Sequence, residues 1–291
     1  MSWDAKTALQ LGRVSNLPTV WSNTLAGVAL AGANPLNGNL LLLVFAMSLA
    51  YIGGMFLNDA FDRKIDAKER PERPIPSKKV KASEVFAAGF TLLAGSIMFS
   101  AITALSWGHN LLWVVVLSIA LCGSIVLYDM WHKDNPYSPV VMGMCRLFVI
   151  LLAGFAATDS PSVVLYYGAL AMLCYLIGLT YTAKQENLGE VKNLWPLLFL
   201  AAPLIYGIIK SASDFQVIPL VVILAIWLIY ALYFIKRRQN GDIPKAVVSM
   251  IAGISLVDAL LIATVSSLPI AMFAIAAFCL TLFLQRYIAG T

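Results

Sequence analysis

Apolar runs long enough to cross a membrane follow one another along almost the whole chain, with only short polar breaks between them. A helix needs about 20 mostly apolar residues to cross the hydrocarbon core, and a membrane admits only structures whose backbone groups are bonded internally. Only 12% of the residues are charged, against about a quarter in ordinary globular domains. We therefore expect an all-α, polytopic membrane protein that forms a single domain, residues 1–291.

We predict nine or ten transmembrane helices. The short join "SSLP" between the last two apolar runs leaves two arrangements open, ten spans or nine spans with a re-entrant hairpin. The expected spans are residues 17–33, 40–57, 84–105, 110–130, 138–157, 162–183, 194–210, 216–235, 245–264 and 268–286.

The basic residues are distributed unevenly about these spans. The net charge of +5 could suggest an acidic partner such as nucleic acid, but in a membrane protein the placement of Lys and Arg matters more than their sum. Of the 20 basic residues, all but Lys210 fall on one side. The positive-inside rule makes that side cytoplasmic. We expect a multi-pass protein of the inner or plasma membrane with both termini cytoplasmic and no nucleic-acid partner.

An acidic stretch, "NDAFDRKID", follows the second span on that side. If the helix continues, Asn58, Asp62 and Asp66 lie at i, i+4 and i+8 and share one face with Asp59. Carboxylates stacked at this spacing repel one another, which favours a bound cation. Mg²⁺ is the natural candidate, because it combines one or two carboxylates with phosphate oxygens and water. The alternative is a charged helix end at the membrane boundary.

Three prolines in the continuation "RPERPIPSKK" prevent helix and favour turns. Arg70, Arg73, Lys78 and Lys79 in this segment are candidates for binding phosphate, which guanidinium groups hold through two parallel hydrogen bonds. Ordinary positive-inside charge is the other interpretation.

Two further breaks on the same side carry candidate site residues. Glu186 and Glu190 after the sixth span are again at i, i+4, a spacing also common on solvated helices. Opposed to the first acidic face, they could hold a second Mg²⁺ with a diphosphate between the two ions. In "YDMWHKDNPYSPVVMGMCR", Lys133 and Arg146 are phosphate candidates, whereas Tyr128 is typical of an interfacial aromatic anchor.

Three segments of the chain resemble the UbiA superfamily of intramembrane prenyltransferases, and most of all its EboC-type branch. They are "NDAFDRKIDAKERPERPIPS", "YDMWHKDNPYSPVVMGMCR" and "YTAKQENLGEVKNLWP". The first matches the superfamily signature NDxxDxxxD at the end of the second span. The chain departs from the superfamily in its second motif, where Glu186 and Glu190 replace the usual aspartates. That substitution puts the second metal in doubt.

The resemblance implies a helical bundle around a central cavity that opens to the cytoplasmic side and, laterally, to lipid. It implies transfer of an isoprenoid chain from a prenyl diphosphate to a small acceptor, with Mg²⁺ as cofactor and membrane lipid as partner. Asp62, Asp66 and Asp59 would be the catalytic acids. The implied metal ligands are Asn58, Asp62, Asp66, Glu186 and Glu190, and the implied substrate contacts are Asn16, Arg70, Arg73, Tyr128, Lys133, Arg146, Tyr181 and Lys184.

Two other functions fit a protein of this composition. A CDP-alcohol phosphotransferase would need a DGxxAR stretch, which this chain lacks. A protein that kept the fold but binds or transports an isoprenoid lipid remains the alternative, motivated by the glutamates in the second motif. The motifs leave open whether the acceptor is aromatic or, as the EboC-type resemblance suggests, a polyol or cyclitol.

Overall fold

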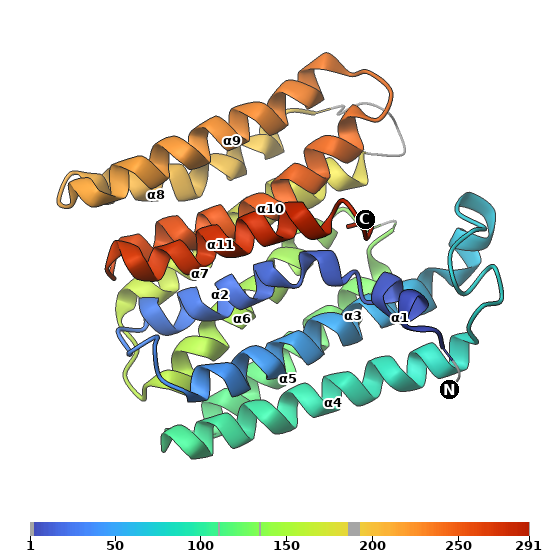
Figure 1. Cartoon of the computed structure of the whole chain (residues 1–291), viewed down its shortest axis with the longest axis horizontal. Helices are drawn as coiled ribbons and strands as arrows, with labels where there is room; N and C mark the ends of the chain where they lie inside the picture. The colour runs from blue at the N-terminus through green and yellow to red at the C-terminus, as the bar shows by residue number, and fades with distance from the viewer. Residues whose placement is uncertain (1–2, 110, 134, 186–192, 291) are drawn as a thin grey trace.

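The computed structural model describes residues 3–109, 111–133, 135–185 and 193–290, and within these ranges the secondary structure is entirely helical. The long helices lie side by side along the longest axis of the molecule (Figure 1). Seven helical segments are long and apolar enough to span a bilayer. They are α3 (Asn39–Glu69), α4 (Ala82–Trp107), α5 (Leu111–Trp131), α6 (Ser138–Ala157), α7 (Val163–Lys184), α9 (Ile218–Arg237, which follows the short turn η4, Phe215–Val217) and α10 (Asp242–Ala263).

The remaining helices are shorter. Three of them occupy positions where the sequence predicts complete spans: α2 (Pro18–Leu30), the pair formed by η3 (Trp195–Ala201) and α8 (Ala202–Ser211), and α11 (Leu268–Leu284). Two short segments precede α2, namely α1 (Ala5–Leu11) and η1 (Val14–Asn16). Helical segments thus stand at all ten predicted positions, and the turn between α10 and α11 is as tight as "SSLP" indicated.

Helix α3 is longer than a membrane requires. Its 31 residues extend about 46 Å, against about 30 Å of hydrocarbon. It continues through Asp66, as the acidic spacing predicts, and ends at Glu69. Arg70 leaves the helical region because it precedes Pro71. The last turns of α3 therefore carry the acidic stretch beyond the apolar part of the helix.

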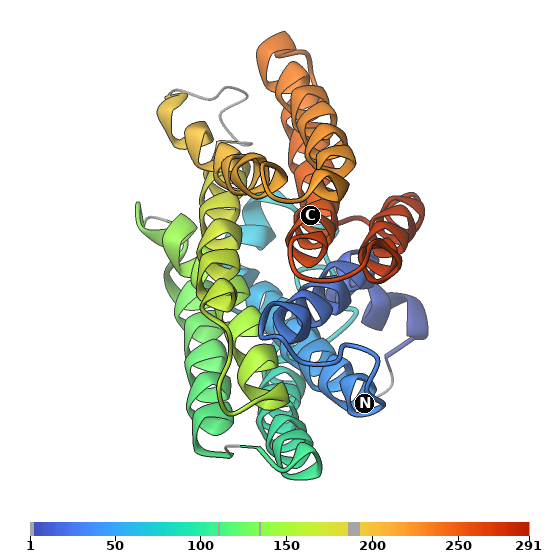
Figure 2. The same ribbon diagram turned by 90° about the vertical axis from the view of Figure 1, so that its left-hand side faces the viewer.

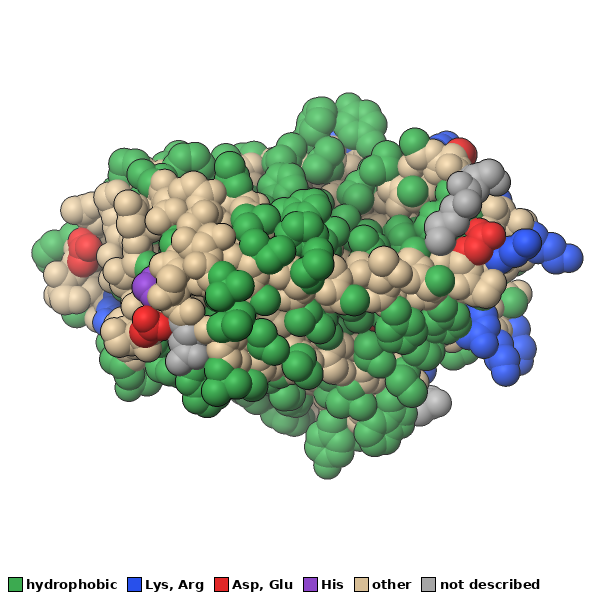
Figure 3. Space-filling view, turned by 90° about the horizontal axis from the view of Figure 1, so that it is seen from below, with side chains coloured by type: hydrophobic (Ala, Val, Ile, Leu, Met, Phe, Trp, Pro, Cys, Tyr) green, Lys and Arg blue, Asp and Glu red, His purple; other side chains and the backbone are tan. Residues whose placement is uncertain are grey.

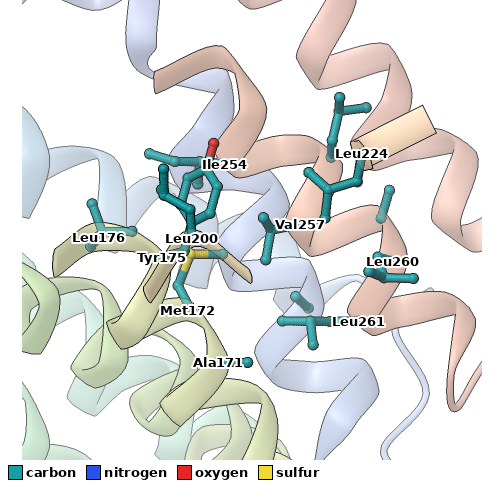
Figure 4. Packing of buried hydrophobic residues seen from close by; sticks show 14 of the residues in the cluster. Ala171, Met172, Tyr175, Leu176, Leu200, Leu224, Ile254, Val257, Leu260 and Leu261 are labelled. Carbon is teal, nitrogen blue, oxygen red and sulfur yellow. The ribbon is translucent and has the colours of Figure 1, made fainter. Parts of the chain in front are cut away.

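The helices pack around α10, whose apolar window is 89% buried. Helices α2, α7, α9 and α11 surround it (Figure 2). The contact with α7 includes Tyr175, whose hydroxyl donates to the carbonyl of Met250 at 2.8 Å, and Figure 4 shows the apolar side chains packed around Tyr175. A second apolar cluster joins α3, α4, α5 and α6. The site described below lies where these two halves of the bundle meet.

Helix α2 is enclosed by protein. All of its residues except Trp21 are buried. At Gly27 the helix approaches α6 so closely that a Cβ atom would lie 2.5 Å from the carbonyl oxygen of Ile150. The polar residues of α2 hydrogen-bond to other helices or to the α2 backbone, which explains how such a segment is accommodated within an apolar bundle.

Charge gathers at one end of the molecule. The first and last described residues lie at the end where α3 finishes (Figure 1). In Figure 3 the Lys and Arg side chains cluster at that end, whereas hydrophobic side chains cover the middle of the same face. This asymmetry agrees with the distribution of basic residues in the sequence, and the cytoplasmic assignment of that end remains a prediction.

Candidate functional site

A cavity of about 340 Å³ opens within the charged end of the bundle. Its polar wall comes from the last turns of α3, the turn after α3 and the end of α5. Its apolar wall includes Leu176 and Leu179 of α7 with Ile251 and Ile254 of α10. A charged head group and an apolar chain could therefore occupy adjoining parts of one space.

The acidic face of α3 forms part of this wall. Asn58, Asp62 and Asp66 all line the cavity, as their helical spacing predicts. Each is at most 7% exposed, and so is the adjoining Asp59. Buried carboxylates require charged or hydrogen-bonding partners, and the structure supplies these from three separate segments.

Arg73 joins two of the acids. Its guanidinium lies 2.9 Å from Oδ2 of Asp66 and 3.3 Å from Oδ1 of Asp59. Arg13, which begins η1 in a left-handed conformation (φ 42°), approaches the same Asp59 oxygen at 2.9 Å. The proline-rich turn thus folds back over α3 and places Arg73 beside the acids, where the sequence placed it.

Asp62 is contacted from α5 and the break that follows it. Its Oδ2 lies 3.4 Å from Nε2 of His132 and 3.6 Å from Nζ of Lys133. The ring of Tyr128 stacks on His132 with centroids 4.9 Å apart. Tyr128 lines the cavity rather than acting only as an interfacial anchor, and Lys133 reaches it as predicted.

Asn58 stands between a cation and an acid. Its amide oxygen accepts from Arg13 at 3.3 Å, and its amide nitrogen donates to Oδ1 of Asp129 at 3.1 Å. These two bonds orient the amide with its oxygen toward the positive group. Asp129 Oδ2 is buried and has no partner among the described atoms.

Sequence reasoning missed Arg13, His132 and Asp129 as members of the site. Arg13 is the last basic residue before the first apolar run, and His132 and Asp129 lie in the same break as Lys133. These positions beside the apolar runs were the signal in the sequence that could have identified the three residues as members of the site. Their contacts with α3 join residues 45 to 71 positions apart in the chain, which helical spacing cannot reveal.

Several other predicted contacts also reach the cavity. Arg70 and Arg146 line it. Lys184 lines it as well, and its ammonium group donates to the carbonyl of Asn135 at 2.7 Å and to Ser138 Oγ at 3.0 Å. These bonds connect the end of α7 to the turn between α5 and α6. Lys184 therefore holds the wall of the cavity together.

Asn16 and Tyr181 occupy different surroundings from those expected. Asn16 lines the cavity, but its amide donates to the carbonyl of Gly290 at 2.8 Å and accepts from Gln285 at 2.9 Å, so the C-terminal segment uses both amide atoms. Tyr181 is absent from the lining, and its hydroxyl accepts from the backbone of Asn193 at 3.2 Å. Glu186 and Glu190 lie outside the described residues.

A smaller apolar cavity of about 80 Å³ adjoins the first. The two share five residues in their walls, among them Tyr51, Tyr128 and Arg146. Asp258, an acid within the membrane-spanning part of α10, lines neither cavity. It is fully buried and accepts from Ser22 at 2.6 Å and Asn23 at 2.9 Å, a structural arrangement.

The oxygen donors of the acidic face suit Mg²⁺. Among the residues that the structure describes, no group of three or more His, Cys, Asp or Glu side chains is arranged to hold a metal ion unaided. Mg²⁺ commonly takes one or two carboxylates and completes its shell with phosphate and water. Asn58, Asp62 and Asp66, which line one wall, therefore fit a metal that binds together with a diphosphate. Their role as ligands remains a prediction.

A helical membrane bundle with acids and bases together in a cavity beside apolar walls fits an amphipathic ligand. The chain belongs to the UbiA prenyltransferase family, whose model matches residues 20–254. This confirms the family that the motifs of α3 indicated. The narrower EboC-type branch remains a prediction.

Relatives of the chain are prenyltransferases. Digeranylgeranylglyceryl phosphate synthase of Methanosarcina mazei is 32% identical over 46% of this chain and 45% of that enzyme. The synthase of Methanothrix thermoacetophila is 27% identical over 77% of this chain and 79% of its own length. 4-Hydroxybenzoate octaprenyltransferase of Pseudomonas fluorescens is 26% identical over 60% of this chain and 56% of its own length. The expected enzyme class, a transferase of prenyl groups, is thereby confirmed.

Solved structures share the fold. A UbiA homologue from Aeropyrum pernix has a TM-score of 0.66 at 14% identity, over 84% of this chain and 97% of its own. A UbiA homologue from Archaeoglobus fulgidus, bound to DMAPP and Mg²⁺, has a TM-score of 0.53 at 11% identity, over 97% of this chain and 100% of its own. These likenesses confirm an all-α, multi-pass membrane bundle.

Proposed function

We propose that this protein is a Mg²⁺-dependent prenyltransferase that moves an isoprenoid chain from a prenyl diphosphate to a small acceptor. The observation that carries the proposal is the cavity in which Asn58, Asp62 and Asp66 face Arg73 and Lys133 beside an apolar wall. A prenyl diphosphate needs both kinds of surface, since its head is highly charged and its chain is apolar.

The residues of the cavity have complementary roles in this reaction. The bond between the first prenyl carbon and the diphosphate oxygen breaks, diphosphate leaves with the electron pair, and the acceptor forms the new bond and loses a proton. Bound Mg²⁺, held by Asn58, Asp62 and Asp66, would supply positive charge to the leaving group. Arg73 and Lys133 donate hydrogen bonds to the same oxygens, and a site shielded from water strengthens that stabilisation.

The pairing of Arg73 with Asp59 and Asp66 has a consequence for binding. A diphosphate that takes the guanidinium leaves Asp66 without the cation that contacts it in the described structure, whereas Asp59 keeps Arg13. Bound metal then replaces the lost positive charge. Diphosphate and metal are therefore expected to bind together, each more tightly in the presence of the other.

A direct test measures diphosphate release and prenylated product with purified full-length protein, Mg²⁺, prenyl diphosphates of several chain lengths and a panel of acceptors. We expect Asp62→Asn, which preserves size and removes charge, to lower the rate by about 10- to 100-fold at least, the range for loss of groups that only orient metal ligands. The matched control is Asp159→Asn, at a residue whose side chain is 58% exposed beside His109 and which follows the end of α6 that is remote from Ser138. Equal rates in the two variants would overturn the assignment of Asp62.

A second candidate function is binding or transport of an isoprenoid lipid without turnover. The observation that favours it is that Arg73 and Lys133 form ion pairs with the acids of α3, so the chain itself supplies these carboxylates with cationic partners. Transport of a labelled polyprenyl lipid between vesicles, with no diphosphate release for any acceptor in the panel, would replace the enzymatic proposal with this one.

The acceptor belongs to the same proposal. The relatives named above differ in the acceptors that their names indicate, and the aromatic and polyol alternatives both remain open for this chain. Comparison of lipid extracts from cells with and without the gene by mass spectrometry addresses the choice. Loss of a prenylated aromatic product would exclude the polyol or cyclitol, and loss of a prenylated polyol would support it.

A further inference from the structure

The segment that follows α11 leads back to the larger cavity. It comprises residues 285–290, which we call the C-terminal strap. Arg286, Tyr287 and Ala289 in this segment are exposed, whereas Gly290 is buried and lines the cavity. The strap therefore lies on the surface over most of its length and enters the cavity wall at Gly290.

Both ends of the strap are bonded to Asn16. Nε2 of Gln285 donates to Asn16 Oδ1 at 2.9 Å and to the carbonyl of Val248 in α10 at 3.4 Å. The amide nitrogen of Asn16 donates to the carbonyl of Gly290 at 2.8 Å. The backbone N–H groups of residues 286–288 donate only to carbonyls of α11. Beyond Gln285, the bond from Asn16 is thus the one hydrogen bond that joins the strap to the rest of the described bundle.

Gly290 fits closely against Asn16. A Cβ atom at position 290 would lie 3.0 Å from Asn16 Oδ1 and 3.3 Å from Asn16 Nδ2. The backbone of Gly290 is outside the left-handed region, so its conformation is open to other residues. Asn16, and not the backbone, therefore opposes a side chain at position 290, and such a side chain would push the strap away from the Asn16 amide.

Asn16 borders the place where we propose that the charged head group binds. It ends η1, and Arg13, three positions earlier, pairs with Asp59 of the acidic face. Asn16 and Arg13 both line the larger cavity. A diphosphate oxygen there could accept from the Asn16 amide only if it took the place of the Gly290 carbonyl.

This exchange favours the diphosphate. The bond between the Asn16 amide and the Gly290 carbonyl joins two uncharged groups, and such bonds add little net stability because water can replace either partner. A hydrogen bond to an ionised acceptor is roughly twice as strong. The amide also keeps an acceptor throughout, so displacement of Gly290 leaves no buried donor unpaired at Asn16.

We propose that the C-terminal strap is an autoinhibitory contact, in which Gly290 occupies the Asn16 amide and a prenyl diphosphate must displace it. This inference rests on the proposed prenyltransferase function. Only molecules with a released strap have the amide available, so the apparent affinity for the substrate is lowered in proportion to their fraction. A change that loosens the strap therefore tightens substrate binding.

The test measures binding of a non-reactive analogue, dimethylallyl thiolodiphosphate with Mg²⁺, to purified full-length protein in detergent by titration calorimetry. We expect Gly290→Val to bind the analogue about fivefold more tightly than wild-type protein, the factor that corresponds to one net hydrogen bond. Ala289→Val is the matched control, because it adds the same side chain at the exposed neighbouring position. The gain should be absent when Gly290→Val is combined with Asn16→Leu, which removes the amide for which strap and ligand compete.

Tryptic cleavage after Arg286 reports on the strap itself, since cleavage of a transiently opened segment follows the population of the open form. Intact-mass spectrometry measures its rate. We expect cleavage about fivefold faster in Gly290→Val than in Ala289→Val or wild-type protein. The analogue with Mg²⁺ should accelerate cleavage of the wild-type strap. Gln285→Leu removes the bonds at the other end of the strap, so it repeats both measurements without a new side chain at position 290.

The proposal is overturned if Gly290→Val and Gln285→Leu bind the analogue no more tightly than wild-type protein, or if the analogue protects wild-type Arg286 from cleavage. Failure of the prenyltransferase function alone would look different. Gly290→Val would still bind the analogue more tightly, but neither it nor the wild-type protein would release diphosphate with any acceptor. Absence of analogue binding to every variant would overturn the autoinhibitory contact and the diphosphate substrate together.

Discussion

Replacement of Arg73 by glutamine tests whether the basic turn after α3 is part of the folded site or only a substrate contact. Arg73 lies 2.9 Å from Asp66 and 3.3 Å from Asp59, and its side chain is 16% exposed while those of the acids are 4% and 8% exposed. Asp59 keeps Arg13 as a partner in the variant. Asp66 loses the one cation that contacts it in the described structure.

The expected loss of stability follows because Asp66, unlike Asp59, is left without a cation. Removal of one partner from a buried ion pair costs about 3–5 kcal/mol, and the lower figure applies here because the site borders a cavity and Asp59 remains paired. About 3 kcal/mol corresponds to a fall in the melting temperature of roughly 6–12 °C for a chain of this size. Thermal unfolding of purified protein in detergent measures the shift, with Arg286→Gln as the control at an exposed position.

Magnesium provides a second measurement on the same variant. Mg²⁺ should raise the melting temperature of Arg73→Gln more than that of the wild-type protein, because the ion meets carboxylates that no longer have their guanidinium. If Arg73 served only the substrate, its loss would leave the stability of the free protein unchanged or increase it. Equal melting temperatures of Arg73→Gln and the wild-type protein in the absence of Mg²⁺ would therefore refute the structural role of Arg73.

Three further substitutions probe the scaffold through the melting temperature of the purified protein. Gly27→Ala should destabilise by about 1–3 kcal/mol, because the new Cβ would lie 2.5 Å from the rigid backbone of α6; wild-type stability would contradict the close packing. Tyr175→Phe removes a hydrogen bond to Met250 and should cost about 1 kcal/mol, with Tyr287→Phe, at an exposed position, as its control. Asp258→Leu leaves the buried amide of Asn23 without its acceptor, whereas Ser22 can still donate to the carbonyl of Thr19 at 3.2 Å, and it should cost about 1–3 kcal/mol; an unchanged melting temperature would exclude the structural role.

Local periodicity predicted the elements that depend on nearby residues. The continuation of α3 through Asp66 follows from the spacing of its acids, and its end at Glu69 follows from Pro71. The ten helical positions follow from the apolar runs. Each of these features is determined by residues within one or two turns, so a single sequence contains the information.

Features that depend on distant partners could not be predicted in this way. Arg13 and Asp59 are 46 residues apart, and Asn58 and Asp129 are 71 apart. The same limitation explains Asn16, where Gly290 lies 274 residues away and occupies the amide that was expected to bind substrate. Tyr181 precedes the lining residue Lys184 by three positions in the chain, but the direction of the Tyr181 hydroxyl depends on the segment that follows α7.

The enclosure of α2 has a consequence for how the protein is made. Its 13 residues extend about 20 Å, too short to cross the hydrocarbon core, and it contains Ser22 and Asn23, whose partner Asp258 lies 235 residues later than Asn23. At 5–20 residues per second, the ribosome needs roughly 12–47 s to reach that partner. During this interval α2 has a polar group, the amide of Asn23, whose partner in the bundle has not yet been made. The polar contacts that enclose α2 can therefore be completed only after α10 has been synthesised.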